Sequence, residues 1–437
     1  MPTLAAMNSP LDGWGNLLAL FQPAFTAPGF LVFVRLARAW VRCPGRHTLT
    51  RLYALAEPCQ ERAHDAYHRF FSQGAWAMAD LWRWLAQRLV ATLYPQGPLP
   101  VDLDDTLFHK SGRRNQSAAW WRDAVRSTGQ KVVHALGLNL VVLTLRVQPP
   151  WGGEPLGLPI NLRLHRKNGA GLLALAEAMI QELARWFPDR QFALGADGFY
   201  APLAGRDLPR TQVTSRMRRD AALFAPLPET PQPKRKGRPR TKGRRLPTPE
   251  QMARQGQDWK KVTVNVRGKP QVRLVQTHRV LWYRVCPQRP VLLVICRDPA
   301  GHEPDDFFFT TDLPATAVQV LEQYGGRWSI EDTFKNTKQF LGGEDPQVWK
   351  DPGPERAAAF SFWLYSVVWL WHLTNRPKAT AWIRRPWYPQ KTTPSFADAL
   401  AGLRRELWQQ SILAQSDGGT LPHKNITHLI DVLAYAA

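Results

Sequence analysis

The pattern of apolar residues changes its period near residue 100, and this change constrains the fold more than any other feature of the sequence. Before it, apolar residues recur at helical spacing, and after it they form runs of strand length. Three such runs predict strands: Val101–Leu107, Lys131–Val147 and Leu156–Leu164. Gly171–Trp186 then predicts an amphipathic helix, and Phe192–Ala196 predicts a fourth strand. The middle of the chain therefore belongs to the α/β class.

The order of three strands, a helix and a strand is typical of a ribonuclease H-like core. We expect residues 96–205 to form its first part and residues 291–345 its second part, separated by a basic, β-rich insertion at 206–290. We expect residues 1–95 to form an N-terminal helical domain and residues 346–437 to form a helical C-terminal region. The elements predicted after residue 206 are strands at 261–266, 272–285, 291–296 and 307–311 and helices at 315–324 and 328–340.

The chain is strongly basic, with 57 Lys and Arg against 35 Asp and Glu and a pI near 10.3. Residues 206–297 contain 23 of the basic and five of the acidic residues, and so carry +18 of the net charge of +22. An excess of this size implies a polyanionic partner, either nucleic acid or an anionic membrane. No secretory signal is evident, and the apolar stretch Ala357–Leu373 is shorter than the roughly 20 residues that a bilayer requires. We therefore expect a cytoplasmic protein that binds DNA and no membrane, with a buried helix at 357–373.

The densest positive charge lies in an arm at residues 231–249. Gly, Pro and like charges oppose both a helix and a core, so we expect a flexible arm in the free protein. Its Lys-Gly-Arg-Pro-Arg segment at 236–240 resembles an AT-hook, which enters the minor groove of A·T-rich DNA. A nonspecific phosphate-binding linker is an equally good interpretation. In either case the candidate DNA-contacting residues are Lys234, Arg235, Lys236, Arg238, Arg240, Lys242, Arg244 and Arg245.

Acidic residues are scarce, and three of them fall in the first predicted strand. A core strand excludes the charges of Asp102, Asp104 and Asp105 unless they are paired or bind a metal. Two carboxylates about 5 Å apart repel by about 3 kcal/mol at an effective dielectric constant of 20, and a divalent cation between them removes this repulsion. Asp197 directly follows another predicted strand. Hard oxygen ligands of this kind favour Mg²⁺ or Mn²⁺, although a lone Asp after a strand is more often a turn or cap residue.

A third element combines Tyr324, Arg327, Glu331 and Lys338. At about 100° per residue, these side chains share one face about 60° wide, provided that Gly325-Gly326 does not break the helix. A carboxylate flanked by Arg and Lys is suited to holding a metal against a phosphodiester. An ordinary ion-pair face on the surface of a helix is the alternative.

The Tyr-x2-Arg-x3-Glu-x6-Lys spacing, preceded by Thr310-Thr311-Asp312-Leu313, resembles the signature of DDE transposases of bacterial insertion sequences. Asp104-Asp105-Thr106 is similar to the first acidic motif of that family, and Ala196-Asp197-Gly198 is similar to the second. The resemblance covers about residues 100–340. The separation of 134 positions from the second Asp to the Glu is typical of subgroups that insert a β-rich domain there. The Arg/Pro arm and residues 1–95 match no motif of the family.

The resemblance implies that Asp104, Asp197 and Glu331 form a catalytic triad that holds two Mg²⁺ or Mn²⁺ ions, with Asp105 as the main rival of Asp104. It implies a transposase that cleaves the ends of a mobile element and joins the freed 3′-OH ends to target DNA by two-metal-ion chemistry. The partners would be the terminal inverted repeats and target DNA, and a homodimer would form in the synaptic complex. The protein would be bacterial and associated with the nucleoid when it is bound to DNA. Further DNA contacts would come from Tyr324, Arg327 and Lys338.

Two rival classes share part of this evidence. An architectural DNA-binding protein would use the basic arm and insertion without chemistry, and it would need neither divalent ions nor the acids. A ribonuclease H-like nuclease would share the acids and metals but would not join a 3′ end to new DNA. The N-terminal helices and the basic insertion are the expected source of specificity for DNA ends.

Overall fold

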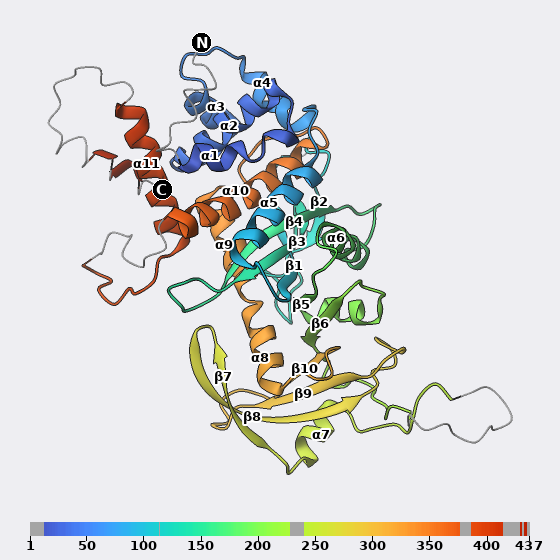
Figure 1. Ribbon diagram of the computed structural model, residues 1–437. Coiled ribbons are helices and arrows are strands. Elements are labelled where there is room, and N and C mark those ends of the chain that lie inside the picture. Colours follow the sequence, from blue (N-terminus) through green and yellow to red (C-terminus); the bar gives the residue numbers. More distant parts are fainter. Residues whose placement is uncertain are drawn as a thin grey trace.

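A mixed sheet of ten strands forms the centre of the part of the chain that the computed structural model describes (Figure 1). That part comprises residues 13–112, 114–227, 240–375, 386–413, 429–430 and 432–434. The strands are β1 (Leu99–His109), β2 (Ala119–Arg122), β3 (His134–Val147), β4 (Leu156–His165), β5 (Phe192–Ala196), β6 (Thr211–Arg216), β7 (Lys260–Val266), β8 (Lys269–Val280), β9 (Val291–Arg297) and β10 (Asp306–Thr310). The helices are α1 (Gly13–Ala19), α2 (Ala27–Arg42), α3 (Leu49–Ala56), α4 (His64–Ser72), α5 (Met78–Leu93), α6 (Leu172–Trp186), α7 (Pro249–Gln255), α8 (Ala317–Gly326), α9 (Ser329–Phe340), α10 (Gly353–Asn375) and α11 (Phe396–Leu413), with 3₁₀ helices η2 (Gln22–Ala24) and η3 (Gly198–Gly205).

Five strands lie in the order β4, β3, β1, β5, β6. β3 is antiparallel to both β1 and β4, whereas β5 is parallel to both β1 and β6. β2 pairs with the first residues of β3, next to the stretch that β4 occupies. The strands and the helix that the sequence predicts between residues 101 and 196 are confirmed. The arrangement is compatible with a ribonuclease H-like core.

The sheet continues beyond β6 through β10, β9, β8 and β7, and each of these pairs is antiparallel. The sequence analysis assigns β6 to the insertion and assigns β9 and β10 to the core. In the structure β6 pairs with β5, while β9 pairs with the insertion strand β8, so the sheet crosses the expected boundaries at residues 206 and 291. The pattern of apolar residues does not predict β6, because several of the buried residues of this strand are small and polar. Thr214 in β6 donates a hydrogen bond of 3.0 Å to the hydroxyl of Thr310 in β10.

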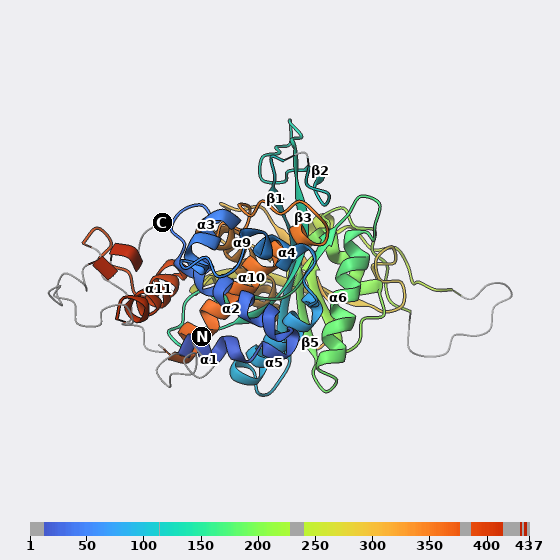
Figure 2. The same cartoon turned by 90° about the horizontal axis from the view of Figure 1, so that it is seen from above.

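Helices cover both faces of β1, β3 and β4 (Figure 2). α6 lies on one face, and α5, α9 and α10 lie on the other. α10 is buried on all sides, and every residue from Ala357 to Leu373 is buried, as the sequence predicts. Its tryptophans are therefore core residues. No helix among the described residues combines the length and the apolar character that a membrane span requires.

The N-terminal helices pack into the same core as the sheet. α2 begins where the Thr26 side chain accepts a hydrogen bond from the Gly29 amide, a polar cap that satisfies an otherwise unpaired N–H group. Trp14 and Trp40 belong to the hydrophobic core that also contains Leu103 of β1. Residues 13–93 therefore share this core rather than forming one of their own.

Candidate active site

Asp102 lies in the buried interior and is neutralised there. Its carboxylate accepts a hydrogen bond of 2.9 Å from Arg146 Nε and forms an ion pair with a terminal nitrogen of the same guanidinium. Arg146 also donates to Gln323 of α8 at 3.1 Å. Because Asp102 is fully buried and paired, its role is to join β1 and β3 to α8.

Asp104 points towards the junction between α8 and α9. Arg327 donates a hydrogen bond of 2.6 Å from Nη1 to Asp104 Oδ2. Burial raises the pKa of Asp104 to about 7, opposed by the nearby Arg327 and assisted by the charges of Asp197 and Asp105. A carboxylic acid that titrates near neutrality within a group of acids is typical of functional sites.

Asp105 faces the opposite side of the sheet, because successive side chains of a strand alternate. Its Oδ1 accepts a hydrogen bond of 3.0 Å from the hydroxyl of Tyr200 in η3. Burial raises the pKa of Asp105, the Tyr200 hydrogen bond lowers it, and the charge of Asp197 raises it. The structure therefore gives the two rival acids different partners: a guanidinium for Asp104 and a phenol for Asp105.

Asp197 ends β5 and caps η3. Its side chain accepts hydrogen bonds from the amides of Phe199, at 3.0 Å, and Tyr200, at 3.4 Å. The Ser215 hydroxyl donates to its carbonyl oxygen at 2.7 Å. Asp197 is thus a cap residue, and it also lies close enough to Asp104 and Asp105 to raise the pKa of each. Because β5 runs parallel to β1 and ends beside Leu103, Asp197 lies next to the middle of β1, where Asp104 and Asp105 are placed.

The structure has two helices here, as the sequence predicts at 315–324 and 328–340, so the single helical face through Tyr324 and Lys338 is interrupted. α8 ends at Gly326, and α9 begins at Ser329. Tyr324 is buried in a second, smaller core between α8 and the strands β7 to β10. Arg327 lies in the interruption, with its guanidinium 5.4 Å from the Tyr324 ring. The break therefore lies just beyond the two glycines, and it directs Arg327 towards Asp104.

Arg327 lies between Asp104 and Glu331. Its side chain is only 5% exposed, and Nη2 is 3.5 Å from Glu331 Oε1 while Nη1 contacts Asp104. Glu331 also lines a pocket of about 360 Å³ that contains Arg267 and Trp328. Burial raises the pKa of Glu331, while the charges of Arg327 and Arg267 oppose this shift. The structure therefore links the third candidate acid to Asp104 through a guanidinium.

Lys338 is held against β1. Its ammonium donates a hydrogen bond of 2.8 Å to the carbonyl of Leu107 and lies 3.9 Å from Glu344. Burial lowers the pKa of Lys338, and the Glu344 carboxylate opposes this shift. The side chain is 25% exposed, so part of it reaches the surface beside the acids.

Four of the eight arm residues, namely Lys234, Arg235, Lys236 and Arg238, lie outside the described residues. The other four, Arg240, Lys242, Arg244 and Arg245, lie in a segment that returns to the sheet. Phe224 pairs with Arg245 on one side and with Leu281 on the other, so the two ends of the arm meet. The ammonium of Lys242 lies 4.1 Å from the Phe224 ring and 4.5 Å from the Tyr283 ring.

Two cations near the acids were not singled out by the sequence analysis. Arg267 occupies the tight turn between β7 and β8 at φ +51°, and its guanidinium lies 4.6 Å from the Trp328 ring. Arg216 ends β6, pairs with Asp306 and lies 6.0 Å from the Tyr324 ring. The Arg-Gly dipeptide at 267–268 signals a hairpin turn, but its contact with α9 depends on the tertiary fold.

The fold and the site define a class of protein: a mixed α/β protein in which Asp104 and Asp105, in the middle of the central strand β1, lie close to Asp197, which follows the parallel strand β5. A family model described as DDE superfamily endonuclease matches residues 21–286. This match covers more than half of the chain, which therefore belongs to the DDE superfamily endonuclease family. A search of curated proteins finds no match. Membership implies a metal-dependent nuclease that acts on DNA.

Members of this family generally use divalent metal ions, typically Mg²⁺. Asp104, Asp105 and Asp197 supply the hard oxygen donors that such an ion prefers, and their mutual repulsion is the interaction that a divalent cation relieves. Among the described residues, no group of three or more acidic, His or Cys side chains is arranged to hold a metal ion. The donor chemistry therefore fits the metal, whereas Arg327 occupies the position between Asp104 and Glu331.

Proposed function

We propose that the protein is a DNA transposase that cleaves the ends of a mobile element and joins the 3′-OH ends to target DNA. The observation that carries the proposal is the grouping of Asp104 and Asp105, in the central strand β1, with Asp197, which directly follows the parallel strand β5. Burial raises the pKa of Asp104 to about 7 within this group. The ribonuclease H-like strand order supports the same reading. The spacing of Tyr324, Arg327, Glu331 and Lys338 resembles the signature of DDE transposases and so favours a transposase over another DNA-acting enzyme of this superfamily.

Asp104 and Asp197 would hold Mg²⁺ or Mn²⁺ together with Glu331, and Asp105 would support Asp104 from the opposite face. Bound divalent ions supply a nucleophilic water and stabilise the leaving 3′ oxygen in this type of chemistry. Asp104 is the preferred first ligand because it shares a face of the sheet with Arg327 and α9, whereas Asp105 is held by Tyr200.

Arg327 would exchange partners during the reaction. Its two terminal nitrogens contact one oxygen of Asp104 and one of Glu331, and the two non-bridging oxygens of a phosphodiester would accept from the same two nitrogens. Asp104 would hold a metal ion, and Arg327 would contact a phosphate beside the cleaved bond. Lys338 would keep β1 and α9 together through the Leu107 carbonyl, with its exposed portion facing DNA.

The remaining positive charge fits the same proposal. The arm and insertion would follow the DNA backbone, and a homodimer on two DNA ends would place one active site at each end. A nuclease without strand transfer is the second candidate, because the matched family is described as endonuclease and the match ends before Glu331.

The test uses DNA built from the inverted repeats that bracket the coding region, with Mg²⁺ and a target plasmid. The proposal predicts strand cleavage at the repeat ends, followed by covalent joining of those 3′ ends to the plasmid. Cleavage without joining would favour the second candidate. DNA binding with no cleavage in Mg²⁺ or Mn²⁺ would support an architectural protein and contradict the proposal.

A further inference from the structure

The segment between β1 and β3 is a second centre of positive charge. Residues 110–134 contain six Lys and Arg and a single acid, Asp123. Outside residues 110–134 and 206–297, the chain has 28 basic and 29 acidic residues. The excess charge is thus confined to two segments, and the function proposed above gives the one at 110–134 no role.

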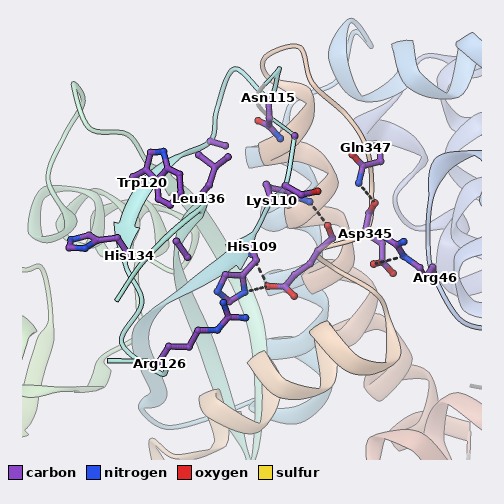
Figure 3. A pocket seen from close by; sticks show the side chains of 15 residues that line it. Arg46, His109, Lys110, Asn115, Trp120, Arg126, His134, Leu136, Asp345 and Gln347 are labelled. Carbon is purple, nitrogen blue, oxygen red and sulfur yellow. Dashed lines mark hydrogen bonds and ion pairs between the residues drawn. The ribbon is translucent and has the colours of Figure 1, made fainter. Parts of the chain in front are cut away.

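This segment forms one wall of a groove of about 970 Å³ (Figure 3). Trp120 of β2 and His134 and Leu136 of β3 lie on that wall, and Arg126 lies at its edge. The facing wall carries Arg46, from the loop after α2, together with Asp345 and Gln347. His109 and Lys110, at the end of β1, lie between the two walls.

The groove leaves one large aromatic ring open to solvent. Trp120 is 60% exposed, although its neighbour Trp121 packs 4.6 Å from the His165 ring on the other side of the strand. Strand alternation places Arg122 on the same side as Trp120. An exposed tryptophan accompanied by arginines is the combination on which unpaired bases stack while the backbone is held by charge.

The acids of the groove are already engaged by other groups. Glu344 accepts hydrogen bonds from the His109 amide, at 2.8 Å, and contacts His109 Nδ1 at 3.1 Å. Asp123, which adjoins the groove lining, contacts His109 Nε2 at 2.8 Å and lies 3.5 Å from Arg126 Nε. Asp345 accepts from the His47 amide at 2.8 Å and lies 3.7 Å from Arg46. Each of these carboxylates therefore already has a hydrogen-bond partner within the protein.

The groove and the candidate active site lie at successive positions along strand β1. His109 is five residues beyond Asp104 on the same strand, a distance of about 17 Å, which equals roughly five stacked nucleotides. Lys338 bridges the interval, because it contacts both Leu107 and Glu344. A DNA strand leaving Asp104 along β1 would pass Lys338 before it entered the groove.

We propose that this groove binds an unpaired end of a DNA strand, with a base stacked on Trp120 and phosphates contacted by Arg126 and Arg46. The proposal rests on the proposed function, since cleavage at Asp104 is what would deliver such a strand end. It assigns the groove a substrate class, single-stranded DNA beside a duplex junction. Duplex DNA is the competing ligand that the experiment separates.

The experiment measures fluorescence anisotropy in EDTA, so that no cleavage occurs, with two labelled DNAs. One is a blunt duplex, and the other is the same duplex with a single-stranded tail of about six nucleotides. The tail should raise the affinity of the wild-type protein. Trp120→Ala should weaken binding of the tailed DNA about 5- to 150-fold and leave the blunt duplex unaffected, and Trp120→Phe should restore most of the difference.

Arg126→Gln should lower the salt dependence of the tailed DNA by about 0.7 in the slope of log K against log salt. Trp84→Ala, a partly exposed tryptophan of α5 outside the groove lining, is the matched control and should behave as wild type. Thermal melting checks that each variant is folded. Equal affinity for tailed and blunt DNA, or an equal loss for both in Trp120→Ala, would overturn the proposal.

The two proposals fail independently. If Asp104→Asn leaves cleavage intact, the proposed active site is wrong, but the tail-binding measurement in EDTA still decides the role of the groove. If Asp104→Asn abolishes cleavage while the tail contributes nothing, the groove proposal alone is lost.

Discussion

Replacing Asp104 by asparagine should stabilise the protein at alkaline pH, because the ionised carboxylate is costly where it lies. Burial raises the pKa of Asp104 from 3.8 to about 7, even with Arg327 2.6 Å away. Between these two values the folded protein keeps a proton that the unfolded chain has lost. The free energy of unfolding therefore falls as pH rises through this window.

The magnitude follows from the size of the shift. About three pKa units at about 1.4 kcal/mol each give a loss of about 4 kcal/mol, complete above pH 7 and absent below pH 3.8. Asparagine has the shape of the protonated acid and cannot ionise. Asp104→Asn should therefore exceed the wild type in free energy of unfolding by about 4 kcal/mol at pH 8 and about 2 kcal/mol at pH 5.

Scanning calorimetry at pH 3.5, 5 and 8, with and without Mg²⁺, measures this difference. Mg²⁺ at 100 times its Kd should restore about 3 kcal/mol to the wild type at pH 8 and nothing to the variant, because the ion binds the ionised acid. Asp332→Asn, which removes an exposed carboxylate of α9, is the control and should change stability by less than about 0.5 kcal/mol. A variant less stable than the wild type at pH 8, or a difference independent of pH, would refute the reasoning.

Three further predictions concern neighbouring residues. Tyr200→Phe removes the hydroxyl that donates to Asp105, so the pKa of Asp105 should rise further, which carboxyl NMR titration would detect; an unchanged titration would contradict the hydrogen bond. Asp102→Ala leaves Arg146 buried without its partner and should lower the free energy of unfolding by about 3–5 kcal/mol in urea; a loss below about 1 kcal/mol would show that the pair contributes little. Glu331→Gln should reduce cleavage by at least about 100-fold while DNA affinity in EDTA stays the same, and an equal loss of affinity would indicate a DNA-binding role instead.

The sequence predicts those elements whose buried residues are apolar. Phe192–Ala196 is recovered residue for residue as β5, and the helix after Gly171 is recovered as α6, because the aliphatic side chains in both face the core. β6 is missed because two of its buried residues, Thr214 and Ser215, are polar and are satisfied there by hydrogen bonds. A search for apolar residues does not detect such positions. The four-residue strand β2 is missed because it is short and one of its tryptophans is exposed.

The sequence identifies the residues of the candidate site, but it does not predict the contacts between their side chains. The predicted strands place Asp104 inside one strand and Asp197 directly after another, and the two approach each other because β1 and β5 are parallel neighbours. The sequence predicts separate helices at 315–324 and 328–340 and so locates the break, but it does not show where the break directs Arg327. As a result, the contact of Arg327 with Asp104 emerges only from the tertiary structure.

Cleavage of a labelled repeat-end DNA by single-residue variants tests the central claim most directly. In Mg²⁺, Asp104→Asn and Asp197→Asn should each reduce the cleavage rate by at least about a thousandfold while binding the DNA as tightly as the wild type in EDTA. Asp105→Asn should retain a larger share of the rate than either. Cleavage that persists in Asp104→Asn or Asp197→Asn would contradict the account.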